Sequence, residues 1–210
     1  MIPEAEAFVQ ADQAAVGLVA QILAAEWELL LPPVFDMPGA DRPTPLRQVV
    51  SRLAYDDAWV PDMLAGRTME EVGRDAYAGD LLGDDPAAAL ARIAAAAQRA
   101  AGQVTDRDAA VHCSYGDAPV WDYFWQLVVA RTLAAHDTAL LLGRPSPLTE
   151  ELARRAWEGV QPMAEVWRGI GVFRDPVAVD DDAGWVERYL ALTGRAAGAA
   201  VSPRAAGSAG

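Results

Sequence analysis

Apolar residues recur every three or four positions along five stretches of the chain, the spacing that gathers them on one face of an α-helix. The first stretch spans residues 5–31 and carries Phe8, Leu18 and Ile22 at this spacing. It ends at Pro32 because proline cannot continue a helix. Further long helices are predicted at 45–64, 86–101, 120–143 and 149–169, with a short last helix at 185–192.

Side chains that begin helices support these limits. Thr44 and Asp85 each stand directly before a proline, an arrangement typical of a helix N-cap followed by the first helical residue. Thr68 and Glu71 have the spacing of a capping box, which predicts a short helical turn between the second and third long helices.

Two short stretches are predicted as strands, one at 109–114 and one at Val177 and Val179. Long helices joined by short connections predict a mainly all-α fold class, an up-and-down four-helix bundle with a short strand pair. The expected domains are the bundle at 1–145, a C-terminal helical extension packed on it at 146–194, and a disordered tail at 195–210.

The charge of the chain narrows the range of partners. Its 17 basic and 30 acidic side chains give a net charge of −13, which repels phosphate backbones and argues against nucleic-acid binding. Residues 1–10 lack the basic start of a signal peptide, and no apolar stretch has the length of a membrane span. The single cysteine, Cys113, excludes an internal disulfide. We therefore expect a cytoplasmic protein without a membrane partner.

Several segments, in order and spacing, resemble one protein family. They are MLAGRT at 63–68, EEVG at 70–73, GDLLGDDP at 79–86, VHCSYGDAP at 111–119, DRPTP at 41–45 and the stretch 149–194. Together they resemble the actinobacterial branch of the mycothiol-dependent maleylpyruvate isomerase-like proteins, which belong to the DinB-like superfamily. The resemblance implies a DinB-like four-helix bundle.

The resemblance also implies a divalent metal, held by a histidine of the second helix and by two residues four positions apart on the fourth. Alignment with this chain places Arg52 at the first ligand position and Ala130 and Ala134 at the other two, and it retains an aspartate as Asp137. A guanidinium cation and two methyl groups cannot coordinate a metal ion. The sequence therefore predicts a site with no metal and no other cofactor.

Loss of two ligand side chains to alanine leaves space that either neighbouring side chains or a ligand must fill. We expect a pocket for a hydrophobic small molecule, between the second and fourth long helices. The residues predicted to bind this ligand are Tyr55, Trp59, His112, Tyr123, Gln126, Ala130 and Ala134.

Three charged residues are the candidate catalytic groups. Arg52 would stabilise a carboxylate or an enolate, and Asp137 or Asp56 would transfer a proton. The alternatives are a structural ion pair of Arg52 with either aspartate, and a salt-bridged or capping Asp137.

Other residues also carry two interpretations. Ala130 and Ala134 could serve only for packing, and the aromatic cluster at 121–125 could be core or a ligand wall. Cys113 is predicted as a small buried hydrophobe, and His136 as a surface histidine or one that supports a neighbouring side chain.

The function predicted from these residues is a metal-independent isomerase, cyclase or dehydratase that acts on a hydrophobic metabolite, in secondary metabolism. One alternative is a non-catalytic protein that binds a small molecule. Another is a metal-containing thiol transferase or isomerase that uses mycothiol. A homodimer is compatible with the sequence, but no feature requires it.

Overall fold

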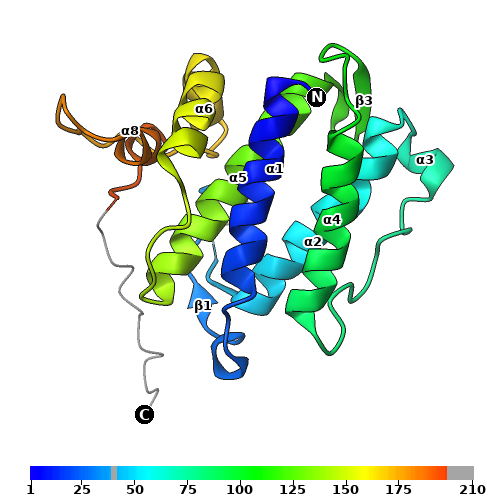
Figure 1. Cartoon of the computed structure of the whole chain (residues 1–210), viewed down its shortest axis with the longest axis horizontal. Coiled ribbons are helices and arrows are strands. Elements are labelled where there is room, and N and C mark those ends of the chain that lie inside the picture. The colour runs from blue at the N-terminus through cyan, green and yellow to red at the C-terminus, as the bar shows by residue number, and fades with distance from the viewer. Residues whose placement is uncertain (39–41, 198–210) are drawn as a thin grey trace.

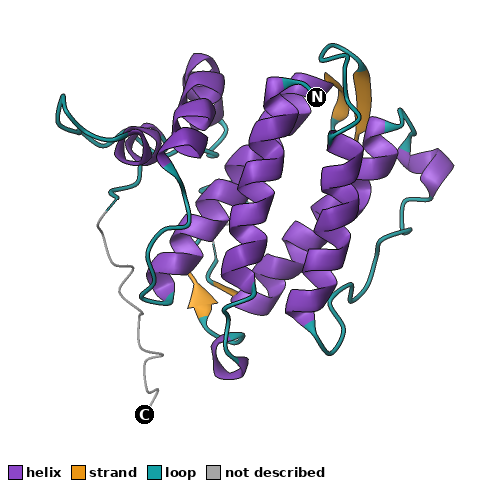
Figure 2. Ribbon diagram, viewed as in Figure 1, coloured by secondary structure: helices purple, strands orange, loops and turns teal. Residues whose placement is uncertain are grey.

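The computed structural model describes residues 1–38 and 42–197. Its centre is formed by four long helices that run side by side (Figure 1): α1 (Pro3–Val19), α2 (Leu46–Leu64), α4 (Pro86–Ala101) and α5 (Val120–Leu141). The most extensive contacts join α1 to α5 and α2 to α4. The predicted mainly helical fold class is confirmed (Figure 2). Residues 198–210 of the predicted tail lie outside the described residues.

Two antiparallel hairpins lie at the ends of this helical layer. β1 (Leu30–Leu31) pairs with β2 (Thr44–Pro45), and β3 (Ala110–Cys113) pairs with β4 (Gly116–Pro119). The strand predicted at 109–114 is therefore confirmed. The strand predicted at Val177 and Val179 is wrong, because both residues are exposed in an irregular segment without a partner strand.

The first helix is shorter than its apolar pattern predicts. α1 ends at Val19 and is followed by a single 3-10 turn, η1 (Ala24–Glu26). Local polar contacts stabilise this early end: the Gln21 amide donates to the Gly17 carbonyl at 2.9 Å, and the Leu23 N–H donates to the Glu26 carboxylate at 2.8 Å. The apolar pattern also breaks down here, since Leu23 is 63% exposed.

Of the three helix caps predicted from the sequence, two are confirmed. Asp85 accepts a hydrogen bond from the Ala88 N–H at 3.1 Å and caps α4, and Thr68 caps the short helix α3 (Met69–Val72). Thr44 is not the N-cap of α2. It lies in β2, its hydroxyl donates to the Arg42 carbonyl at 3.1 Å, and Pro45 takes the cap position.

The C-terminal extension packs on one side of the bundle. It contains α6 (Glu150–Val160), the 3-10 turn η2 (Gln161–Met163), α7 (Ala164–Gly169) and α8 (Trp185–Leu192). The single helix predicted at 149–169 is interrupted at Pro162, which has no N–H to donate. α6 contacts α1, α5 and α8, so this helix is the main contact between the extension and the bundle.

Gly159 of α6 lies against the indole of Trp125. A Cβ atom at Gly159 would lie 2.2 Å from the Trp125 ring, so we expect Gly159→Ala to lower the free energy of unfolding by about 1–3 kcal/mol. Urea denaturation measures the change. Gly17→Ala is the control, because a Cβ at Gly17 meets no atom within 4 Å. Equal stability of the two variants would contradict this packing.

Candidate functional site

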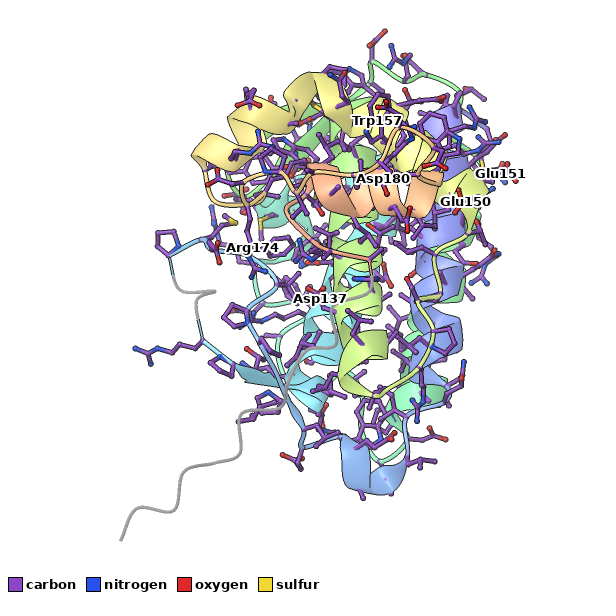
Figure 3. The ribbon with its side chains drawn as sticks, turned by 90° about the vertical axis from the view of Figure 1, so that its left-hand side faces the viewer. Asp137, Glu150, Glu151, Trp157, Arg174 and Asp180 are labelled. Atoms are coloured by element: carbon purple, nitrogen blue, oxygen red, sulfur yellow. The ribbon has the colours of Figure 1, made fainter. Side chains whose placement is uncertain are left out.

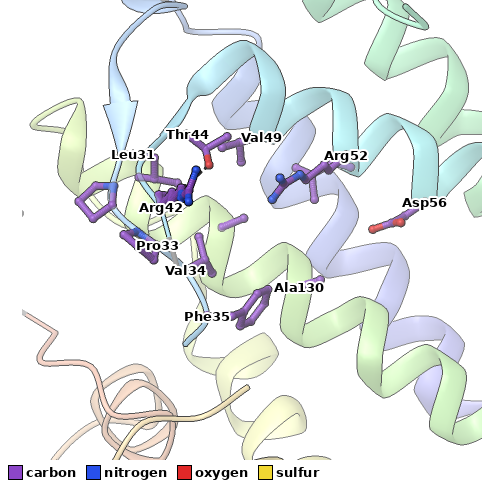
Figure 4. Close-up of a pocket in the computed structure, with 13 residues that line it drawn as sticks. Leu31, Pro33, Val34, Phe35, Arg42, Thr44, Val49, Arg52, Asp56 and Ala130 are labelled. Carbon is purple, nitrogen blue, oxygen red and sulfur yellow. Dashed lines mark hydrogen bonds between the residues drawn. The ribbon is translucent and has the colours of Figure 1, made fainter. Parts of the chain in front are cut away.

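A pocket lies between α2 and α5, at the place predicted from the sequence. We call it the inner chamber; its volume is about 130 Å³. Its residues are Leu31, Pro32, Pro33, Val34, Phe35, Arg42, Thr44, Val49, Arg52, Leu53, Asp56, Ala130 and Ala134, most of which are labelled in Figure 4. The three positions aligned with metal ligands, Arg52, Ala130 and Ala134, therefore line one space.

The inner chamber has few charged groups in an otherwise largely apolar wall. Arg52 and Asp56 are one helical turn apart on α2 and both line the chamber (Figure 4). Neither side chain forms a hydrogen bond or ion pair with another described residue, so the alternative of an ion pair between Arg52 and Asp56 or Asp137 is not found. Burial raises the pKa of Asp56, and the positive charges of Arg131 and Arg52 oppose this rise. Asp56 is therefore a carboxyl group that keeps its proton to higher pH than an exposed aspartate.

Two further hollows adjoin the inner chamber. The outer chamber, of about 480 Å³, shares Phe35 and Ala130 with it and extends to Gln126 and Trp167. A side hollow of about 160 Å³ shares Asp56. Among the residues predicted to bind ligand, Tyr55, Trp59 and Tyr123 line this side hollow. The structure thus brings all the predicted positions of α2, and those of α5 except Asp137, to one continuous face.

Asp137 lies outside these hollows and forms an ion pair, which agrees with the salt-bridged alternative to a catalytic role. Its carboxylate accepts hydrogen bonds from Arg195, with Nη2 at 2.9 Å. Arg195 follows α8 and is the first residue of the predicted disordered tail, yet it is buried and ion-paired. None of the hollows includes Asp137 among its lining residues. The structure therefore gives no support to a catalytic Asp137.

The C-terminal extension holds the loop that forms one wall of the inner chamber. Arg195 Nη2 donates to the Val34 carbonyl at 2.5 Å, and Arg174 Nη2 donates to the Pro33 carbonyl at 2.6 Å. The Asp36 N–H donates to the Gly171 carbonyl at 2.9 Å. Figure 3 shows Asp137 on α5 and Arg174 beside this loop. Asp137 thus positions an arginine that fixes the chamber wall.

His112 was expected to line the ligand pocket and Cys113 to be buried, but Cys113 is the one that lines a hollow. The His112 ring lies 2.8 Å from the Asp117 carboxylate, across the β3–β4 hairpin, and does not line any of the three hollows. Cys113 is half-buried and lines the side hollow. Successive strand residues face opposite sides, so only one of the two could face the bundle. Burial raises the pKa of the Cys113 thiol, which disfavours a thiolate.

His136 is buried, so its prediction as a surface histidine is wrong. It is 1% exposed, and its Nδ1 lies 3.0 Å from the Ser146 hydroxyl. Burial lowers the pKa of the imidazole. In the aromatic cluster, Phe124 and Trp125 belong to the core, while Tyr123 is both buried and part of the side hollow.

A buried ion cluster is the main feature that the sequence did not predict. Arg131 of α5 is fully buried and donates a short hydrogen bond to Asp57 of α2. Asp12 of α1 lies on its other side, with 3.5 Å between Arg131 Nε and Asp12 Oδ1. Gln98 donates to the remaining oxygen of Asp12 at 2.6 Å, and the guanidinium stands over the Phe8 ring. Two carboxylates therefore share one cation in the core, behind Asp56.

The residues present do not fit the divalent metal that the family resemblance implies. The aligned ligand positions supply a cation and two methyl groups, and Asp56 is the single carboxylate among the described residues that line the inner chamber. Within residues 1–38 and 42–197, no three His, Cys, Asp or Glu side chains gather as metal ligands. Any acid–base chemistry in this chamber therefore depends on Arg52 and Asp56.

No helix in the described part of the chain combines the length and the hydropathy needed to cross a bilayer. The chain matches no protein-family model, no curated protein and no solved structure with which it was compared.

Proposed function

We propose that this chain binds a hydrophobic small molecule between α2 and α5 and acts on it without a metal, as an isomerase, cyclase or dehydratase. The observation that carries the proposal is the convergence of Arg52, Asp56, Ala130 and Ala134 on one chamber. Two alanines leave room for an organic ligand, and the two charged groups can support acid–base chemistry there.

We also propose that the helices form a DinB-like bundle from which the metal ligands have been lost. The support is geometric. Arg52 on α2 and the alanines one turn apart on α5 align with metal ligands in the family pattern, and these three positions line one chamber. Residues that correspond to a shared site are expected to converge in this way.

The chemistry follows from Arg52 and Asp56, two of the three charged residues that line the chamber. Burial brings the pKa of Asp56 closer to neutrality than that of an exposed aspartate, which favours a general acid or base. Arg52 keeps its positive charge and can stabilise a carboxylate or a developing enolate oxygen. The proton that Asp56 takes from one carbon returns to another atom of the same molecule, so an isomerisation of this type needs no co-reactant.

A non-catalytic binding protein is the second candidate. One observation favours it: Asp137 is held by Arg195, so the described lining of the inner chamber contains one carboxyl group and no second proton-transferring partner. A mycothiol-dependent, metal-containing enzyme has less support because the chamber offers no set of metal ligands.

The test is turnover of a mixture of hydrophobic metabolites, followed by mass spectrometry in the presence of a chelator. We expect one component to be converted to an isomer or to a product that has lost water. Asp56→Asn is expected to slow this conversion at least about 100-fold, because general acid–base catalysis contributes about 10²–10⁴-fold. Loss of activity with the chelator would contradict a metal-independent reaction.

A variant that fills the inner chamber separates binding from catalysis. Ala134→Trp is expected to abolish both turnover and the rise in melting temperature caused by a bound ligand. Ala91→Trp, on the exposed face of α4, is the matched control and is expected to retain both. A rise in melting temperature without turnover by the unaltered chain would favour the binding protein.

A further inference from the structure

Two arginines of the inner chamber have no anionic partner in the described chain. Most arginines of this acidic protein form ion pairs, such as Arg47 with Asp80 and Arg144 with Glu26. The side chains of four arginines form no hydrogen bond or ion pair with another described residue: Arg42, Arg52, Arg92 and Arg99. All four arginines are exposed; Arg92 and Arg99 lie on α4, whereas Arg42 and Arg52 also line the inner chamber.

This pairing pattern is informative because the chain carries a net charge of −13. With so many carboxylates available, an arginine next to an apolar chamber would readily form an ion pair with one of them. Asp56 lines the same chamber but does not form an ion pair with either arginine. Figure 4 shows Arg42 near Thr44, Arg52 on α2 and Asp56 further along the helix.

The inner chamber is too small to hold a whole drug-sized molecule. Its volume is about 130 Å³, and ligand pockets commonly measure about 300–1,000 Å³. The outer chamber, of about 480 Å³, adjoins it at Phe35 and Ala130 and is walled mainly by apolar residues, among them Val129 and Ile170. A ligand that fills both spaces has a small end near the arginines and a larger apolar body.

We propose that the ligand is an apolar carboxylic acid, bound with its carboxylate at Arg42 and Arg52 and its body in the outer chamber. This inference rests on the proposed function for the location of the site and adds the substrate class. Guanidinium groups match carboxylates in geometry and are weakly hydrated, so they suit a partly apolar site.

The charge at the far end of the outer chamber determines which way round the ligand binds. Asp122 lines this end and accepts a hydrogen bond from Gln126 at 2.9 Å, while Tyr115 donates to Gln126 at 2.6 Å. A second anionic group of the ligand would meet the Asp122 carboxylate there. The site therefore favours a monoanion whose distal end is apolar or carries a hydrogen-bonding group.

Calorimetric titration with paired probes tests the proposal. Decanoate and 2-naphthoate are the anionic probes, and 1-decanol and 2-naphthalenemethanol are their neutral counterparts. We expect both acids to bind at least about 10-fold more tightly than the matching alcohols, because a charge-assisted hydrogen bond is stronger than a neutral one. Arg42→Gln and Arg52→Gln are each expected to remove about 10-fold of the affinity for the acids and little of that for the alcohols.

Arg92→Gln and Arg99→Gln are the matched controls, since both residues are unpaired and exposed but lie away from the chamber. Equal binding of acids and alcohols would overturn the proposal. An equal loss of acid binding in the α4 variants would overturn it as well, because it would indicate general electrostatic attraction.

The outcome is separable from that of the proposed function. Acids that bind through Arg42 and Arg52, without any turnover sensitive to Asp56→Asn, would support the ligand class and contradict the enzyme. Turnover that depends on Asp56 but is insensitive to both arginine substitutions would support the enzyme and contradict the ligand class.

Discussion

Arg131→Met is expected to lower the free energy of unfolding by about 3–5 kcal/mol, the usual cost of removing one partner from a buried ion pair. Arg131 is fully buried, and its guanidinium is the shared partner of Asp12 and Asp57. Methionine fills much of the same volume, so the expected loss arises from two buried carboxylates that are left without a cation. Urea denaturation followed by circular dichroism measures it.

Two comparisons sharpen this result. Arg154→Met removes an exposed pair with Glu158 on one helix and is expected to cost at most about 1 kcal/mol. Adding Asp12→Asn and Asp57→Asn to Arg131→Met removes the buried charges as well, so part of the lost stability is expected to return. A cost no greater for Arg131→Met than for Arg154→Met would show that the cluster does not stabilise the fold.

Asp57→Asn is expected to flatten the dependence of stability on pH. Burial raises the pKa of Asp57 from 3.8 to about 7; Arg131 opposes this rise and Asp12 adds to it. Between pH 4 and pH 7 the folded chain therefore holds a proton that the unfolded chain has lost. The free energy of unfolding should fall as pH rises through this range, by on the order of 4 kcal/mol, and this fall should shrink in the variant.

Chemical denaturation at a series of pH values checks this prediction. Asp84→Asn is the control, because Asp84 is exposed in a turn and should leave the pH profile unchanged. Asp56 also has a raised pKa and contributes in the same direction, so some slope is expected to remain in Asp57→Asn. A profile identical to that of the unaltered chain would show that Asp57 does not hold the proton.

Helical spacing accounts for what the sequence predicted well. Residues four apart share a face, so the spacing of Arg52 and Asp56 on α2 and of Ala130 and Ala134 on α5 was enough to assign them to one chamber. The same spacing placed Asp137 on that stripe. Asp137 does not line the chamber, however; its carboxylate binds Arg195, the first residue of the predicted tail.

The rest of the site depends on contacts between segments distant in the sequence. Nothing local shows that the loop at 31–35 covers α5, or that Arg42 enters the chamber. The buried ion cluster needs three helices to meet, although one signal was available. Asp12 is four residues from Phe8 on the apolar face of α1, and Arg131 stands in an otherwise apolar stretch of α5. Two opposite charges on apolar faces are a reason to expect that they meet.

The hydrogen bonds from Arg174 and Arg195 to the carbonyls of Pro33 and Val34 make the two predicted domains interdependent. A chain cut after residue 145 would lose both arginines, and the loop that closes the inner chamber would have no anchor on that side. A deletion or recombination event at this boundary is therefore expected to keep the four long helices but to destroy the binding site. The two parts should be inherited as a single unit.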